Sequence, residues 1–201
     1  MKTPLILIAM LPLAGCISFG AKPPPTLLTL TSVSSVPVGQ NQDSATAKSI
    51  TIQVPVVPQS LATARVPVQA TPTSIAYVTD AQWAEPPARL FARLVSDTVA
   101  ARTGYVVLST AQSIGDPGAQ LAGELRNFGL NATSREAVVT FDASLTRVGT
   151  QTVEKHRFEA RVPVSAIDAT SAAAGINQAA NQVATEVADW IGRGTSCCSE
   201  R

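Results

Sequence analysis

Charged, aromatic and histidine residues are all scarce in this sequence of 201 residues. Charged side chains make up 14% of the chain, against about 25% in typical soluble domains. The 15 basic and 14 acidic side chains nearly cancel to a net charge of +1, so the chain offers no basic surface of the kind that nucleic acids require. We therefore expect no nucleic-acid partner, and the low charge favours a partner that is apolar or uncharged.

Signatures of catalysis and of metal binding are also missing. The single histidine, His156, has no neighbouring cysteine and no cluster of carboxylates, which excludes a zinc site of the usual kind. The sequence contains no G-x-S-x-G turn for a serine nucleophile, and no G-x-x-x-x-G-K-[ST] or G-x-G-x-x-G motif for a nucleotide. Asp142 and Glu159 fall on neighbouring predicted strands, where carboxylates usually only face solvent. We expect no enzyme, no catalytic residue, no metal site and no cofactor-binding site.

The one long apolar run, residues 5–13, is too short to cross a membrane. It follows the positively charged Lys2 and covers about half of the ~20 residues that a transmembrane helix needs. Residues 13–16, LAGC, resemble the lipobox of bacterial lipoproteins. The resemblance implies that a signal peptide at 1–15 is removed and that a diacylglycerol is attached to the sulfur of Cys16. A plain signal peptide with an incidental cysteine is the alternative.

The lipobox resemblance also implies a location. Two or three acyl chains on Cys16, palmitate among them, give stable anchoring, whereas one chain alone is marginal. Ile17 stands where an inner-membrane retention signal typically has aspartate, so the anchor is expected in the outer membrane, facing the periplasm. The other cysteines, Cys197 and Cys198, are adjacent in the polar tail 195–201. They are either an incidental pair or a site of intermolecular crosslinking in an oxidising periplasm.

Residues 16–49 are rich in Pro, Thr, Ser, Gln and Gly, which is typical of a largely flexible tether. Within them, residues 26–31 alternate threonine and leucine and can pair as a short edge strand. At ~5 to 6 Å times the square root of its length, a loose tether of about thirty residues spans only about 30 Å. The tether would keep the domain near its own membrane.

From residue 50 the pattern changes to β-branched and alternating segments. Short extended stretches are predicted at 50–57, 64–68, 74–78 and 105–109. Pro55, Pro58 and Pro67 cannot donate to a strand ladder, so these strands belong at an edge or the prolines lie at strand ends. Longer strands follow at 120–130, 137–145 and 153–164. Apolar and polar residues alternate strictly in the middle one, which predicts an antiparallel meander with one buried face.

Two helices complete the predicted domain. Pro86 and Pro87 suit the first turn of the first helix, and Gly104 ends it. The last helix is predicted at 168–191, with one narrow apolar stripe. We therefore predict a single α+β domain at 50–194, a mostly antiparallel sheet with the two main helices packed on one face.

The motif DAQWAEPP, residues 80–87, is unusual for a strand-to-helix junction. A tryptophan in this position either packs the start of the helix against the sheet or anchors a partner. We take Trp83, Glu85 and Pro86, with the exposed side of the last helix, as candidate partner-binding residues. A purely structural role of Trp83 is the alternative.

The order of these motifs resembles the ABC-type transport auxiliary lipoproteins, a family that includes PqiC, the lipoprotein of the paraquat-inducible system. The resemblance rests on the lipobox ending at Cys16 and on the segments ITIQVPVVPQSLATARVPVQ, SIAYVTDAQWAEPPARLFARLVSDTVAARTG, LAGELRNFGLN, HRFEARVPV and VADWIG. The segment with WAEPP is the most specific of them. Their order and spacing, rather than any one motif, carry the resemblance.

The resemblance implies a PqiC-like accessory lipoprotein of a transporter that contains an Mce-domain protein, an ATPase and a permease. Such transporters are expected to move phospholipid or other hydrophobic molecules between the inner and outer membranes, and this subunit would dock the Mce protein. Two alternatives stay open: a lipoprotein for envelope assembly or peptidoglycan synthase activation, and a lipid hydrolase, against which the missing nucleophile motif counts. The alanine-rich last helix also leaves a homo-oligomer open.

Overall fold

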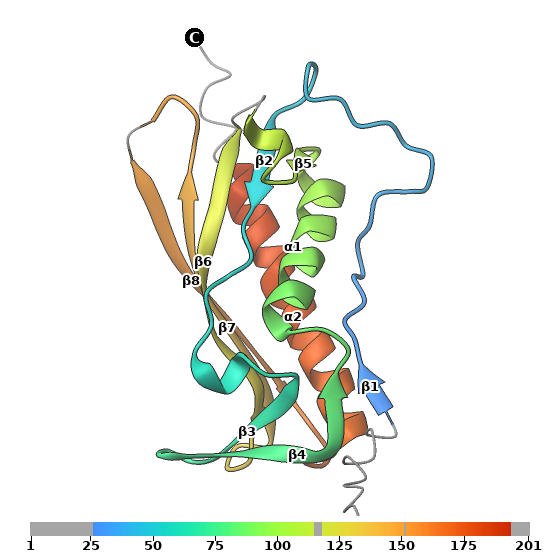
Figure 1. Ribbon diagram of the computed structural model, residues 1–201, viewed down its shortest axis with the longest axis vertical. Helices are drawn as coiled ribbons and strands as arrows, with labels where there is room; N and C mark the ends of the chain where they lie inside the picture. The colour runs from blue at the N-terminus through green and yellow to red at the C-terminus, as the bar shows by residue number, and fades with distance from the viewer. Residues whose placement is uncertain (1–25, 115–117, 151, 194–201) are drawn as a thin grey trace, which may run out of the picture.

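The computed structural model describes residues 26–114, 118–150 and 152–193, which form two helices on one mixed sheet (Figure 1). The strands are β1 (Thr26–Leu28), β2 (Ser49–Ile52), β3 (Arg65–Thr71), β4 (Ser74–Trp83), β5 (Val106–Leu108), β6 (Ala119–Asn131), β7 (Glu136–Thr146) and β8 (Val153–Pro163). The helices are α1 (Pro87–Thr103) and α2 (Ala169–Arg193), with single 3-10 turns η1 (Gln59–Leu61) and η2 (Gln112–Ile114). The predicted α+β class is confirmed.

The predicted antiparallel meander is formed by β6, β7 and β8. Leu125, Phe141 and Phe158 lie side by side across the three strands on the face that the helices cover. A bulge between Leu125 and Asn127 adds one residue to β6, so that both Leu125 and Phe128 are buried. The alternation of apolar and polar residues in β7 reflects one buried face and one open face.

The other edge of β6 carries two short branches. Near its start β6 pairs in parallel with β2, which pairs in parallel with β5. Near its end it pairs in parallel with β3, which forms a hairpin with β4, and β4 pairs in parallel with β1. The long pairings are antiparallel, as predicted, whereas most of the short ones are parallel and join segments far apart in the sequence.

The prolines of the first strands take two different positions. Pro55 and Pro58 follow the end of β2, in agreement with one of the two predicted placements. Pro67 lies inside β3, and the edge placement is wrong for this strand because β4 and β6 flank it. The sheet tolerates Pro67 because the register with β4 shifts between Arg65 and Pro67, and pairing with β6 begins only at Val68.

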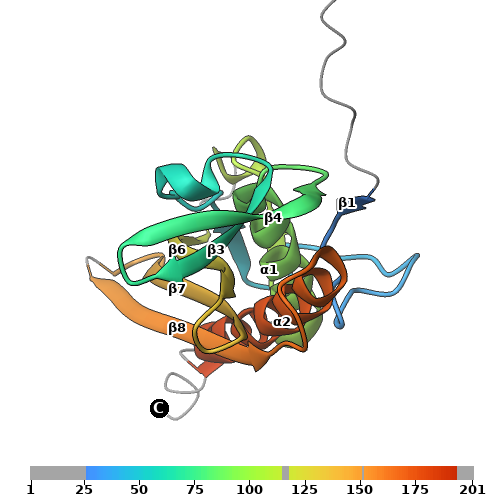
Figure 2. The same cartoon turned by 90° about the horizontal axis from the view of Figure 1, so that it is seen from below.

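Both helices begin and end close to the predicted residues and cover the same face of the sheet (Figure 2). Pro87 is the first residue of α1, and Gly104 caps its end in the left-handed conformation at φ 70°. Asp168 caps the start of α2, since its Oδ1 accepts the backbone N–H of Ser171 at 2.8 Å. α2 packs on β7 and β8, and α1 packs against α2.

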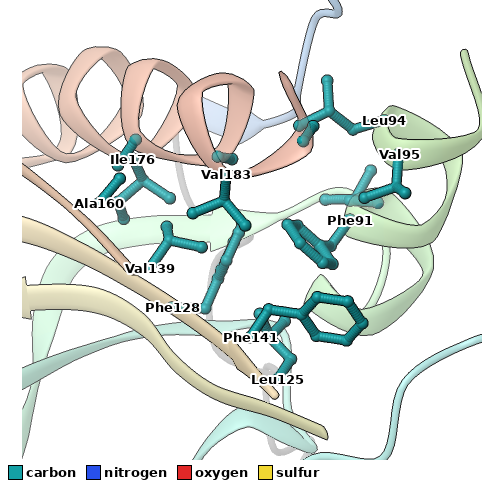
Figure 3. Packing of buried hydrophobic residues seen from close by; sticks show 14 of the residues in the cluster. Phe91, Leu94, Val95, Leu125, Phe128, Val139, Phe141, Ala160, Ile176 and Val183 are labelled. Carbon is teal, nitrogen blue, oxygen red and sulfur yellow. The ribbon is translucent and has the colours of Figure 1, made fainter. Parts of the chain in front are cut away.

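The core lies between the helices and the sheet and contains a cluster of aromatic rings (Figure 3). The ring of Phe91 in α1 lies 5.2 Å from that of Phe141 and 6.3 Å from that of Phe128, both in edge-on arrangements. Ile176 and Val183 of α2 point towards Val139 and its neighbours in the sheet. One apolar core therefore joins both helices to the meander.

Helix α2 is buried over more of its surface than the predicted narrow stripe, because it is enclosed by α1, the sheet and the N-terminal segment. Its buried residues are Ala172, Gly175, Ile176, Ala179, Ala180, Asn181, Val183, Ala184, Val187, Ala188 and Ile191. Small residues allow this close packing. A Cβ on Gly175 would lie 2.6 Å from Val164 Cγ1 and 3.0 Å from Ala137 Cβ. The alanine-rich surface thus serves contacts within one chain.

Part of the predicted tether is built into the domain. Strand β1 confirms the short strand expected within 26–31, although it ends at Leu28. The chain then runs along the helices before it reaches β2 (Figure 1). The predicted signal peptide, Cys16 and the rest of the tether up to residue 25 lie outside the described residues, as do Cys197 and Cys198 in the tail.

Candidate docking surfaces

The junction between β4 and α1 is a bend to which strand β1 is attached. Asp80 adopts a positive φ of 55° at the point where the register of β4 with β3 shifts. Residues 81–83 then pair with β1, and the Ala84 N–H donates to the Leu28 carbonyl at 2.8 Å. The N-terminal segment thus occupies one edge of the junction that the sequence marks as a partner site.

Glu85 and Pro86 remain at the surface of this junction. Pro86 is exposed, and its carbonyl accepts the Arg89 N–H at 2.9 Å in the first turn of the helix. Both carboxylate oxygens of Glu85 accept a hydrogen bond from Arg93 Nη2 at 2.9 Å. An exposed pair of this kind adds little to stability. A partner-binding role for Glu85 and Pro86 stays a prediction.

Trp83 is a core residue, which favours the purely structural role that was the alternative to a partner anchor. It is 2% exposed, and its ring lies 5.2 Å from that of Phe128. The Trp83 Nε1 atom is buried without a hydrogen-bond partner among the described residues. The sequence could not settle the direction of the ring, because a tryptophan at the end of a strand packs equally well inward or outward.

The exposed side of α2, the second predicted partner surface, is partly covered by the protein's own N-terminal segment. The Thr31 N–H donates to Asn177 Oδ1 and the Val33 N–H to Asn181 Oδ1, both at 2.9 Å. The sequence alone did not single out Asn177 and Asn181 as contact residues. Their spacing of four residues puts them on one side of the helix, which is the signal that could have singled them out.

The open face of β6, β7 and β8 carries paired charges. The charged residues on this face are Glu124, Arg126, Glu136, Asp142, Lys155, Arg157, Glu159 and Arg161. Arg157 donates to both oxygens of Asp142, with Nη2 2.7 Å from Oδ2. Arg161 Nε lies 2.8 Å from Glu159 Oε1. Basic and acidic residues balance here, so this face suits a polar protein surface better than a polyanion.

The two carboxylates that could form an acid–base pair are both held in the ionised state. The hydrogen bond from Arg157, helped by the charges of Arg157 and Arg126, holds the pKa of Asp142 below its ordinary value against partial burial. Burial alone would raise the pKa of Glu159, but hydrogen bonds from Thr140 and Arg161 lower it overall. Neither group is suited to donate a proton near neutral pH.

Two depressions lie on the same open face. A pocket of about 110 Å³ lies between η1, the β3–β4 hairpin and the meander, and Arg126, Val138 and Arg161 line its meander side. The hairpin can come this close because Gly129 has no side chain. A Cβ at this position would lie 2.3 Å from the Pro67 carbonyl oxygen. A more open depression of about 640 Å³ lies beside Val56 and Arg157. The sequence did not predict these pockets, since the first depends on how the hairpin bends over the sheet and the second on the segment after β2, where Val56 pairs with Glu124.

The described residues contain no group of three or more His, Cys, Asp or Glu side chains placed to hold a metal ion. His156 is exposed, and its ring stacks 4.5 Å from Phe158 and 6.1 Å from Trp190. Within the same described ranges, no helix is long and apolar enough to cross a membrane.

Comparison with known proteins defines the family. A family model for the ABC-type transport auxiliary lipoprotein component matches residues 29–188. A solved structure from Xanthomonas campestris, assigned to DUF330, has a TM-score of 0.71 at 20% identity and covers 88% of this chain and 100% of its own. An uncharacterized protein has a TM-score of 0.61 at 13% identity, covering 85% and 100% of the two chains. No match was found among the curated proteins.

The chain belongs to the family of ABC-type transport auxiliary lipoproteins, because the family model spans most of its length. The two solved structures show that the fold is shared at low sequence identity. The protein is therefore an auxiliary lipoprotein of an ABC-type transport system.

Proposed function

We propose that the protein is an outer-membrane lipoprotein, anchored through Cys16 on the periplasmic face, that serves as an accessory subunit of an Mce-type ABC transporter. The transporter would move phospholipid or other hydrophobic molecules between the inner and outer membranes. This subunit would act by docking rather than by catalysis. The observation that carries the proposal is the match of residues 29–188 to the auxiliary lipoprotein family, directly downstream of the LAGC motif.

The open face of the meander is the docking surface that fits this role best. The helices cover the opposite face of the sheet, and the N-terminal segment covers part of α2. The open face combines paired charges with the exposed side chain of Val56, 71% exposed, at its edge. Protein interfaces typically have this mixed polar and apolar character.

Affinity purification of the full lipidated chain from detergent-solubilised envelopes tests the proposal. We expect an Mce-domain protein to be recovered with it, and we expect the Cys16→Ser chain to leave the outer-membrane fraction. Recovery of a peptidoglycan synthase in place of the Mce protein would favour the cell-wall alternative. Labelling of the purified domain by a serine-reactive probe would favour the lipid hydrolase.

A further inference from the structure

Two asparagines of α2 form hydrogen bonds with the backbone of the N-terminal segment, as the backbone of a neighbouring strand would. Asn177 Oδ1 accepts the Thr31 N–H and Asn181 Oδ1 accepts the Val33 N–H, each at 2.9 Å. Asn181 Nδ2 also donates to the Thr31 carbonyl at 2.9 Å and to the Asn177 carbonyl at 2.8 Å. Asn181 is 6% exposed, and its amide oxygen and nitrogen are both paired, whereas the bond from Thr31 to Asn177 lies at the surface.

Apolar contacts and strand pairing attach the same segment on either side of the asparagines. Leu28 is buried in the core, and Leu30 packs against the core from its edge. Strand β1 pairs with the end of β4. The hydroxyls of Ser32 and Thr98 lie 3.3 Å apart, which adds a contact to α1. Residues 26–33 therefore touch the sheet and both helices.

We propose that Asn177 and Asn181 clamp the chain that leads from the lipidated Cys16, so that the β1 end of the domain faces the membrane. The proposal rests on the lipidation of Cys16, which belongs to the proposed function. With the clamp closed, Thr26 lies ten positions (26 minus 16) after Cys16. A chain of ten residues reaches about 35 Å at most.

Release of the clamp together with β1 would lengthen this leash considerably. The next strand, β2, begins at Ser49, which is 33 residues (49 minus 16) from Cys16. A loose chain of that length spans about 30 Å on average and reaches more than about 100 Å when extended. The clamp and β1 together therefore set how far the domain moves from its membrane.

The clamp also sets orientation, because its point of attachment lies at one end of an elongated domain. Figure 1 shows β1 at the same end as the start of α2, whereas the β7–β8 turn and the end of α2 lie at the opposite end. The 25 residues of α2 extend about 37 Å, which is more than the ~35 Å that the closed leash reaches at full extension. The β1 end is thus held beside the membrane, and the β7–β8 turn faces the periplasm.

Energy transfer from fluorescent lipid headgroups tests this orientation in liposomes that carry the full lipidated protein. A fluorescent amino acid is placed at Thr170, at the start of α2, or at Thr150, in the β7–β8 turn; both residues are exposed. We expect stronger transfer at position 170 than at position 150. Equal transfer at the two positions, or stronger transfer at position 150, would overturn the proposal.

Substitution of Asn177 and Asn181 shows whether these two residues, and not another contact, set the orientation of the domain on the membrane. In the N177A/N181A double variant, in which only β1 still attaches the segment, we expect the difference between positions 170 and 150 to shrink and amide hydrogen exchange at Thr31 and Val33 to accelerate. The Q178A/Q182A double variant alters exposed neighbours on the same helix and should change neither readout. If N177A/N181A folds poorly, N177A alone removes one of the backbone bonds and should give a partial acceleration.

A double variant that frees the segment but keeps the transfer difference would also contradict the proposal. Failure of the proposed function looks different. In that case the C16S chain stays on the membrane or no Mce protein is recovered, while the exchange rates of Thr31 and Val33, which need no lipid, still respond to N177A/N181A.

Discussion

Trp83 joins three parts of the fold. Its ring packs on Phe128 of β6, its backbone N–H donates to the Ala64 carbonyl at 2.7 Å, and its strand leads directly into α1. A buried aromatic side chain in such a position contributes chiefly through the apolar area that it removes from water. We therefore infer that Trp83 contributes to the stability of the fold rather than to recognition of a partner.

Truncation of Trp83 tests this assignment. We expect W83A to lower the free energy of unfolding by about 3–5 kcal/mol, since it opens a cavity beside Phe128. Urea denaturation of the purified protein measures this free energy of unfolding. Q82A, at an exposed position of the same strand, should change the free energy by less than about 0.5 kcal/mol. If W83A costs no more than Q82A, Trp83 is not a core residue.

The pKa of Asp142 gives a second test at the residue scale. Because the folded state lowers this pKa, the contribution of Asp142 to stability is full above the ordinary carboxylate pKa of about 4 and is lost as the pH falls through the lower folded pKa. We expect D142N to be less stable than the unsubstituted protein at pH 7, and the difference in urea midpoint to shrink as the pH is lowered towards 3. S144A on the same strand should show no such trend. A difference that grows on acidification would contradict the assignment.

At the scale of elements, α2 is the part of the fold that the other layers enclose. Gly175 lies where α2 approaches β7, and the added Cβ of an alanine would meet Val164 and Ala137. Close packing, rather than backbone freedom, therefore explains glycine at this helical position. The same reasoning explains why alanine dominates the buried side of the helix.

The two glycines of α2 give a matched pair of variants. We expect G175A to destabilise the domain by about 1–3 kcal/mol through overpacking, although alanine is the better helix former by about 1 kcal/mol. At Gly192 the nearest neighbour of the added Cβ is Thr103 Cγ2 at 3.8 Å, an ordinary contact, so G192A should be neutral or slightly stabilising. Thermal unfolding compares the two. Equal effects would show that propensity, not packing, decides at position 175.

Sequence patterns of neighbouring residues correctly predicted the helices and strands whose position depends on neighbouring residues alone. The alternation in β7 and the caps at Gly104 and Asp168 each depend on residues close in the sequence, and the structure has these elements within a few residues of their predicted bounds. The parallel pairings of β2 with β5 and of β1 with β4 leave no such pattern, because their partners lie far along the chain.

The candidate site was harder to predict for the same reason. The bond from Thr31 to Asn177 joins residues 146 positions apart, so only the folded structure reveals that the N-terminal segment covers part of the predicted helix surface. The inward direction of Trp83 likewise depends on Phe128, which belongs to a strand beyond α1. Glu85 and Pro86 lie at the surface of the junction, and their partner role stays a prediction.

At the scale of the whole molecule, the domain has two faces with different surroundings. The helical face carries the N-terminal segment on α2, whereas the meander leaves its paired charges and two depressions uncovered. An accessory subunit of a transporter needs one surface for its own membrane attachment and another for its partner. We propose that the β1 end serves the first role and the open sheet face the second.

Photocrosslinking in whole cells tests this assignment most directly. A photoreactive amino acid replaces Arg157 on the open sheet face or Gln178 on the exposed side of α2, and mass spectrometry identifies what each position captures. We predict that position 157 captures an Mce-domain protein and that position 178 does not. Capture of that protein from position 178 alone, or of a peptidoglycan synthase from position 157, would contradict it.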